Sequence, residues 1–154
     1  MTYKRWLISW IGNADNVAAE AGSAAGFGPV ATALLSSEKF DRVYLLTNYG
    51  HERSSAYCAW LEQRCGYEGA DVDLQEIDFR SPIDYASIYN EVSKHLKDLG
   101  LPRQDVELTL HLSPGTPAMA AIWIMLAKTR FPAKLIQTSK EHGLESVDFP
   151  FDLA

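Results

Sequence analysis

Short apolar runs alternate with helical segments along the whole chain, and this alternation constrains the fold more than any other feature of the sequence. Several runs are rich in β-branched and aromatic residues and stop at glycine, asparagine or serine, which is typical of buried strands. The predicted strands are residues 6–11, 41–46, 72–77, 106–112 and 133–137, and residues 144–149 form a candidate sixth strand. Strands separated by helices pair in parallel, because a helix is the usual right-handed crossover.

The segments between these strands carry helix signals. Gly28-Pro29 predicts the start of one helix, since proline suits the first helical position, and residues 52–64 predict the next. Ser81-Pro82 predicts a third helix capped by the serine, with apolar residues every three or four positions after it. A fourth helix follows Thr116-Pro117.

The chain has 154 residues, which is enough for one domain with its own core over residues 1–154. We therefore predict a three-layer, Rossmann-like α/β sandwich with a mainly parallel sheet of five or six strands and the strand order 3-2-1-4-5. Residues 13–27 are rich in alanine, glycine and asparagine, and we expect a long loop there.

Charge and composition exclude several classes of function. Fourteen basic and twenty acidic residues give a net charge of −6, which does not suit a protein that grips a long nucleic-acid backbone, although a local pocket can still hold a small anion. The first apolar run stops at Gly12, and no run approaches the length of a membrane span, so we expect a cytoplasmic protein. The scattered histidines and the lack of a CxxC pair give no reason to expect a metal or another cofactor.

The predicted strand order places the first and fourth strands side by side, where the winding of the sheet reverses direction. Ligands of open parallel sheets bind at this point, outside the carboxyl ends of the strands. Ser113, Pro114, Gly115 and Thr116 follow the fourth strand. Gly115 permits a positive φ, and Thr116 caps the next helix, whose exposed N–H groups suit a phosphate. The alternative is that this segment is only good turn and capping chemistry.

Other residues are expected at the same edge. Gly12, Asn13 and Asn16 follow the first strand, and the two amides suit a ribose hydroxyl or a base edge. Further candidates are Thr47, Asn48 and Tyr49, which end the second strand, and the tyrosine ring can stack on a base. Lys140 follows the fifth strand and is the one cation expected to pair with a phosphate there. A solvated turn explains the two asparagines equally well, while packing is the favoured explanation for Tyr49 and a solvated hairpin turn for Lys140.

Two further patterns are weaker. Residues 26–31 match the GxGxxA dinucleotide pattern, but they do not follow the first strand directly, and no acid ends the second strand. NAD binding is therefore our third hypothesis. His111 ends the fourth strand and either approaches the pocket or packs under a helix.

The residues around the fourth strand resemble a known family. Residues 110–119 read LHLSPGTPAM, which is similar to the Ser/Thr-x-Gly-Thr-x-x-Met signature of CARF domains (CRISPR-associated Rossmann fold). Residues 28–35, 40–48 and 123–139 resemble the CARF-like N-terminal domain of the sigma-54-dependent activator of an RNA-repair operon. The resemblance covers most of the chain, and it departs from the family in the alanine- and glycine-rich stretch after the first strand.

This resemblance implies a homodimer that shares a pocket for a cyclic oligoadenylate or another RNA-derived phosphorylated nucleotide. Ser113, Gly115 and Thr116 would hold phosphate or ribose, and Met119 would pack beneath the turn. The chain would be a regulatory domain, either alone or cut from a longer regulator in which an ATPase and a DNA-binding domain follow. Some CARF domains also cleave their cyclic ligand, so the alternative function is that of a metal-independent ring nuclease.

Overall fold

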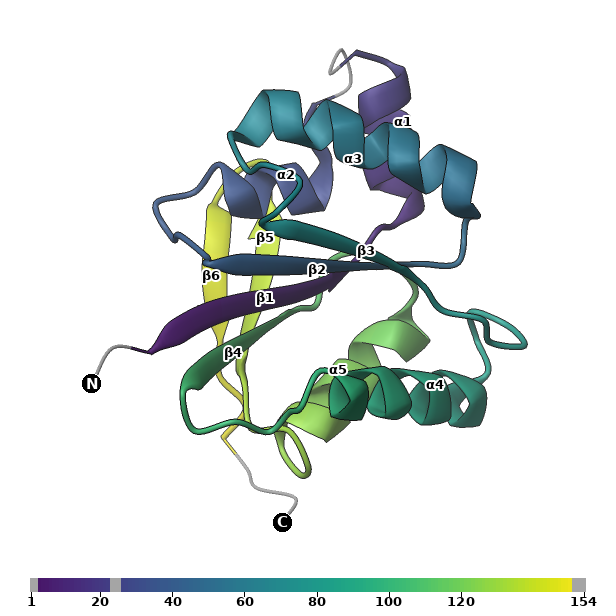
Figure 1. The fold of residues 1–154 in the computed structure, drawn as a ribbon, viewed down its shortest axis with the longest axis vertical. Helices are drawn as coiled ribbons and strands as arrows, with labels where there is room; N and C mark the ends of the chain where they lie inside the picture. The colour runs from purple at the N-terminus through teal and green to yellow at the C-terminus, as the bar shows by residue number, and fades with distance from the viewer. Residues whose placement is uncertain (1–2, 23–25, 151–154) are drawn as a thin grey trace.

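The computed structural model describes residues 3–22 and 26–150, which form one sheet covered by helices on both faces (Figure 1). The strands are β1 (Lys4–Trp10), β2 (Arg42–Thr47), β3 (Val72–Glu76), β4 (Val106–His111), β5 (Lys134–Ser139) and β6 (Gly143–Val147). The helices are α1 (Asn13–Glu20), α2 (Gly28–Leu34), α3 (His51–Cys65), α4 (Tyr85–Asp98) and α5 (Pro117–Ala127). No helix in the described ranges is long and apolar enough to cross a membrane.

The sheet has the order β3-β2-β1-β4-β5-β6, which confirms the predicted Rossmann-like arrangement and its sixth strand. The first five strands are parallel, and β6 pairs with β5 in the antiparallel direction through a tight hairpin. β1 pairs with β2 on one side and with β4 on the other, so that Trp6 lies between Arg42 and Leu108. The sheet therefore extends in both directions from β1. The predicted strand limits differ from the observed ones only at the ends.

The expectation of a long loop over residues 13–27 is wrong where the structure describes a helix. α1 occupies Asn13–Glu20, and residues 23–25 lie outside the described residues. The side chains that α1 buries are those of Asp15, Asn16 and Ala18, so its inner face is mostly polar. Periodicity could not reveal this helix, because that method finds an inner face only where it is apolar.

The predicted start of α4 is also wrong. Asp84 caps this helix, since its Oδ1 atom accepts a hydrogen bond from the Ser87 N–H at 3.1 Å. Ser81 instead stabilises a turn before the helix, where its hydroxyl oxygen accepts from the Ile83 N–H at 3.3 Å. Two capping signals therefore lie three residues apart, and the second one is used.

The two faces of the sheet carry separate cores. α4 and α5 cover one face, and α1, α2 and α3 cover the other (Figure 1). The α4–α5 side packs large side chains such as Trp10 and Trp123, whose ring centroids lie 6.3 Å apart. The α1–α3 side packs mostly aliphatic residues such as Leu7 and Val30, and its buried aromatic residues are Phe40, Tyr57 and Tyr67. This difference matters for the site, because polar groups gather on the second side.

Candidate functional site

The loops after β1 and β4 touch each other at the carboxyl edge of the sheet. The closest approach is between two glycines: a Cβ atom added to Gly12 would lie 2.8 Å from the Gly115 nitrogen. Gly12 is the N-cap of α1, and Thr116 is the N-cap of α5, so the positive ends of two helices meet here. Glycine is required at position 12 for space, since its φ of −92° is open to any residue.

Gly115 is required for two reasons. Its φ of 92° is left-handed, and a Cβ there would lie 2.7 Å from the Met119 sulfur, which packs beneath the turn. The Thr116 N–H points at the same sulfur at 3.1 Å. Gly115 itself is exposed, and in the described part of the chain no backbone carbonyl accepts from its N–H. The nitrogen of this N–H packs against Gly12.

The Thr116 hydroxyl already accepts one hydrogen bond and donates another. Its oxygen accepts from the Met119 N–H at 3.2 Å, which is the predicted helix cap. Its proton goes to the Pro82 carbonyl at 2.6 Å, which ties the β3–α4 loop to the turn. A ligand that takes a hydrogen bond from this hydroxyl must displace the bond to Pro82.

A buried carboxylate positions Gly12 from below. The Asp15 oxygens accept from the Gly12 N–H at 2.8 Å and from the Val30 N–H at 2.9 Å, and this side chain is fully buried. Burial raises the pKa of Asp15 to about 6, although both N–H donors favour the ionised form. Asp15 thereby joins the starts of α1 and α2 and takes up one of the N–H groups of the edge.

A chain of hydrogen bonds crosses the sheet beneath the same edge. His111 is fully buried, with Nδ1 3.1 Å from the Ser9 hydroxyl and Nε2 2.9 Å from the Thr138 hydroxyl. The Ser9 hydroxyl donates to the Trp10 carbonyl, which assigns the imidazole proton to Nδ1 and leaves Nε2 to accept from Thr138. Burial lowers the pKa of His111 to about 3, so the ring is neutral and serves as a structural group.

Ser113 connects the ends of β4 and β5. Its hydroxyl oxygen accepts from the Thr138 N–H at 2.8 Å and lies 3.4 Å from the Thr138 carbonyl. Pro114 is buried beside Gly12, since an added Cβ at Gly12 would lie 3.5 Å from the Pro114 Cα. Ser113 therefore holds the turn in place, and the exposed donor surface begins at Gly115.

The residues at the end of β2 do not all reach the edge. Thr47 is fully buried, with its hydroxyl 2.7 Å from that of Ser54 and accepting from the Tyr49 N–H at 3.0 Å. Asn48 and Tyr49 are exposed, and the Arg53 guanidinium lies 5.4 Å from the Tyr49 ring centroid. Thr47 therefore shapes the turn, while the tyrosine ring is open to solvent on one side.

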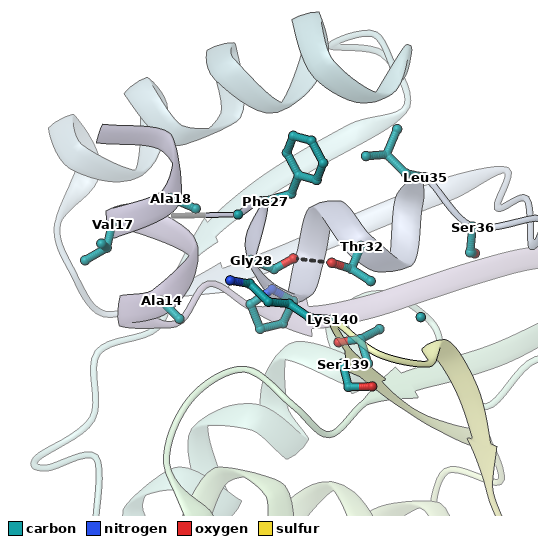
Figure 2. Close-up of a pocket in the computed structure, with 14 residues that line it drawn as sticks. Ala14, Val17, Ala18, Phe27, Gly28, Thr32, Leu35, Ser36, Ser139 and Lys140 are labelled. Carbon is teal, nitrogen blue, oxygen red and sulfur yellow. Dashed lines mark hydrogen bonds between the residues drawn. The ribbon is translucent and has the colours of Figure 1, made fainter. Parts of the chain in front are cut away.

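Two of the predicted polar residues have unexpected positions. Asn13 is exposed at the start of α1, but Asn16 is buried, and its amide nitrogen has no partner among the described residues. Lys140 lies in the β5–β6 turn and lines a cavity between that hairpin, α1 and α2 (Figure 2). Neither Gly12 nor Gly115 lines this cavity, so the structure does not bring Lys140 together with the two glycines.

The dinucleotide pattern at residues 26–31 is not in the required place. α1 lies between β1 and this segment, and the segment opens α2. The fingerprint works only where a glycine-rich turn joins the first strand directly to its helix. In this chain the turn between β1 and its helix contains Gly12, and the Asp15 carboxylate accepts a hydrogen bond from the Gly12 N–H there.

Sequence reasoning missed three features of this site. The first is Asp15, which the spacing Gly12-x-x-Asp15 could have indicated as a helix-capping pair. The second is the bond from Thr116 to Pro82, which joins residues 34 positions apart. The third is the cavity, which residues from distant segments form together.

Comparisons with known proteins agree with this architecture. The family model described as "Regulator of RNA terminal phosphate cyclase" (RtcR) matches residues 32–149. Among solved structures, Csm6 of Enterococcus italicus bound to cyclic hexa-2′-fluoro-hexa-dAMP superimposes with a TM-score of 0.70 at 19% identity. The match covers 89% of this chain and 34% of the Csm6 chain, so this chain spans about a third of that protein. A comparison with curated proteins gives no match. The chain belongs to the family of regulators of RNA terminal phosphate cyclase and has the fold of a CARF domain.

Proposed function

We propose that this chain is a regulatory domain that senses an RNA-derived phosphorylated nucleotide at the edge formed by Gly12 and Gly115. The ligand class is a cyclic oligoadenylate or an oligoadenylate that ends in a cyclic phosphate. The observation that carries the proposal is the contact between the N-termini of α1 and α5, where Gly115 is an exposed residue whose N–H has no backbone acceptor among the described residues.

The physical reason is the unpaired N–H groups of the two helix starts. The first N–H groups of a helix have no partner within it, and each helix start contributes about 0.3–2 kcal/mol to anion binding. Asp15 takes up the Gly12 N–H, so the donors left for a phosphate include the N–H groups of Gly115 and of Asn13 at the start of α1. Pro117 has no N–H, and the Met119 N–H is already bonded to the Thr116 hydroxyl. Asn13 and Tyr49 are exposed and suit the ribose and base of the same ligand.

Two relatives support this ligand class. The family is described as regulating an enzyme that acts on RNA terminal phosphate, and the similar Csm6 structure was solved with a cyclic six-nucleotide ligand. Neither glycine lines any of the three cavities described in this chain. A homodimer that places two such edges face to face would enclose the ligand.

We place this domain in a transcription activator of the sigma-54-dependent class, with residues 1–154 acting as one sensing unit. In that arrangement an ATPase and a DNA-binding domain follow it, and ligand binding changes the packing of the dimer. The full reading frame of the gene tests this part directly.

Calorimetric titration tests the ligand class. Cyclic tetra- and hexa-adenylate and a linear oligoadenylate ending in a 2′,3′-cyclic phosphate are added in turn, with the 3′-hydroxyl oligomer as the matched ligand control. We expect saturable heat and a raised melting temperature with at least one of the phosphorylated or cyclic ligands. No response to any of them at high concentration would contradict the proposal.

A variant pair locates the site. Gly115→Ala is expected to abolish the response, because the new Cβ meets Met119 and alters the turn. Gly66→Ala is the control: it also places alanine at a positive φ, 76°, but a Cβ there has open space around it. Chromatography of the incubated mixture separates sensing from cleavage, and turnover without metal would favour the ring nuclease.

A further inference from the structure

The cavity between α1, α2 and the β5–β6 hairpin is the largest of the three described, with a volume of about 780 Å³ (Figure 2). This volume falls within the range of about 300–1,000 Å³ that is usual for small-molecule sites. Ala14 of α1, Gly28 of α2 and Ser139 of β5 all contribute to its wall. None of the residues assigned to the nucleotide edge, Gly12, Asn13, Tyr49 or Gly115, lines it.

The upper wall of this cavity is apolar and open to water. Val17, Phe27 and Leu35 line it, and their exposed fractions of 43%, 39% and 46% are high for large apolar side chains. They come from α1, from the approach to α2 and from the residue after α2, and all three line the same cavity. A flat apolar molecule that covered them would remove water from three large side chains at once.

The lower wall is polar and positively charged. The Ser139 oxygen accepts from the His142 N–H at 3.0 Å, which leaves its proton for a ligand. The Lys140 side chain passes Gly26, where an added Cβ would lie 2.8 Å from the Lys140 Cε atom. Within the described ranges no carboxylate forms an ion pair with Lys140, and none lines the cavity.

The floor between these walls is held rigidly. Thr138 lines the cavity, and its hydroxyl is bonded to the buried His111 ring, while its N–H donates to Ser113. On the opposite side, Thr32 donates to the Gly28 carbonyl at 2.7 Å. Fixed polar groups of this kind orient a ligand without a large entropic cost.

We propose that this cavity is a second ligand site, which takes a flat aromatic molecule that carries one carboxylate or phosphate group. The ring lies against Val17, Phe27 and Leu35, and the anionic group pairs with Lys140 and accepts from the Ser139 hydroxyl. The site is separate from the nucleotide edge and does not depend on the function proposed for it.

Protein-observed NMR with 2-naphthoate tests this proposal, and the neutral 2-naphthalenemethanol serves as the matched probe. A ring acid of this size binds with a Kd of about 1 mM at the usual affinity per atom of a compact ligand. We expect saturable shifts that cluster on the amides around the cavity. Shifts that scatter over the surface, or that never saturate, would overturn the proposal.

Three variants sharpen the test. Lys140→Gln is expected to weaken 2-naphthoate about fivefold, as for a partly exposed ion pair, and to leave the neutral probe unchanged. Lys39→Gln, at an exposed lysine that does not line the cavity, is expected to change neither. Ala14→Trp is expected to fill the cavity and abolish both, after its fold is checked by circular dichroism. Binding that survives in a folded Ala14→Trp protein, or that ignores Lys140→Gln, would contradict the assignment, and the shift mapping on the unmodified chain decides the matter if this variant fails to fold.

Discussion

The two sides of the sheet differ in what they bury. Eight polar side chains are buried in the described residues, and only Ser93 belongs to the α4–α5 side. The others lie on the α1–α3 side or on the sheet face beneath it: Ser9, Asp15, Asn16, Thr47, Ser54, Thr109 and His111. A buried polar group without a hydrogen-bond partner destabilises the folded state. Such groups are therefore retained where they position other side chains or backbone groups.

The difference teaches which side is scaffold and which side is site. The α4–α5 side is held by apolar packing, with Trp6, Trp10 and Trp123 in one core. The α1–α3 side has two short helices whose starts are fixed by Asp15, and it carries the large cavity. Apart from the turn at Gly115 and Thr116, where α5 begins, substitutions on the first side should therefore change stability, and substitutions on the second should change pH response and ligand binding.

Trp123→Ala should have the largest effect on stability. Trp123 is completely buried against Trp10, and removing a buried tryptophan side chain costs about 3–5 kcal/mol. Urea unfolding followed by circular dichroism measures the change in the free energy of unfolding. A loss below about 1 kcal/mol would mean that the α4–α5 side is not the scaffold.

The pH dependence of stability should separate Asp15 from His111. The folded-state pKa of Asp15 is raised to about 6, so its contribution is present at low pH and is lost as the pH rises from about 4 to 6. The folded-state pKa of His111 is lowered to about 3, so its contribution grows as the pH rises from about 3 to 6.5. Between pH 4 and 6 the two contributions oppose each other.

Removing either titratable group should leave the other group's effect on the pH dependence of stability unopposed. Relative to the unmodified chain, Asp15→Asn should make stability rise by about 2 kcal/mol more between pH 4 and 6, since this window lies between the unfolded and folded pKa values of Asp15. His111→Gln should make it fall by a similar amount. Urea unfolding at several pH values measures both profiles, and profiles parallel to that of the unmodified chain would show that neither group has a shifted pKa.

Thr116→Val should have the smallest effect on stability and a clear local one. Loss of the helix cap costs about 0.5–2 kcal/mol, and loss of the bond to Pro82 should increase hydrogen exchange in the β3–α4 loop. The control is Thr129→Val, because the Thr129 hydroxyl donates only to the Met125 carbonyl near the end of the same helix. Equal exchange in the two variants would show that the bond to Pro82 does not hold the loop. We also expect Thr116→Val to weaken nucleotide binding, which the same calorimetric titration measures.

The sequence predicted the scaffold better than the site, for a physical reason. Apolar runs such as that of β1 and capping residues such as Thr116 act locally, so the strands, their order and the β4–α5 turn followed from pattern alone. α1 was missed because its inner face buries Asp15 and Asn16, and the start of α4 was misplaced because Ser81 and Asp84 both carry capping signals. Contacts between distant segments have no local signal.

The position of nucleotide binding tests the central claim most directly. In a protein-observed NMR titration with an oligoadenylate ending in a 2′,3′-cyclic phosphate, the amide signals of Gly12, Asn13 and Gly115 should shift and saturate together. Gly12→Ala, which forces the two loops apart without straining φ, should remove these shifts. Saturable binding that leaves those amides unmoved and shifts the α4–α5 side instead would contradict the assignment of the site.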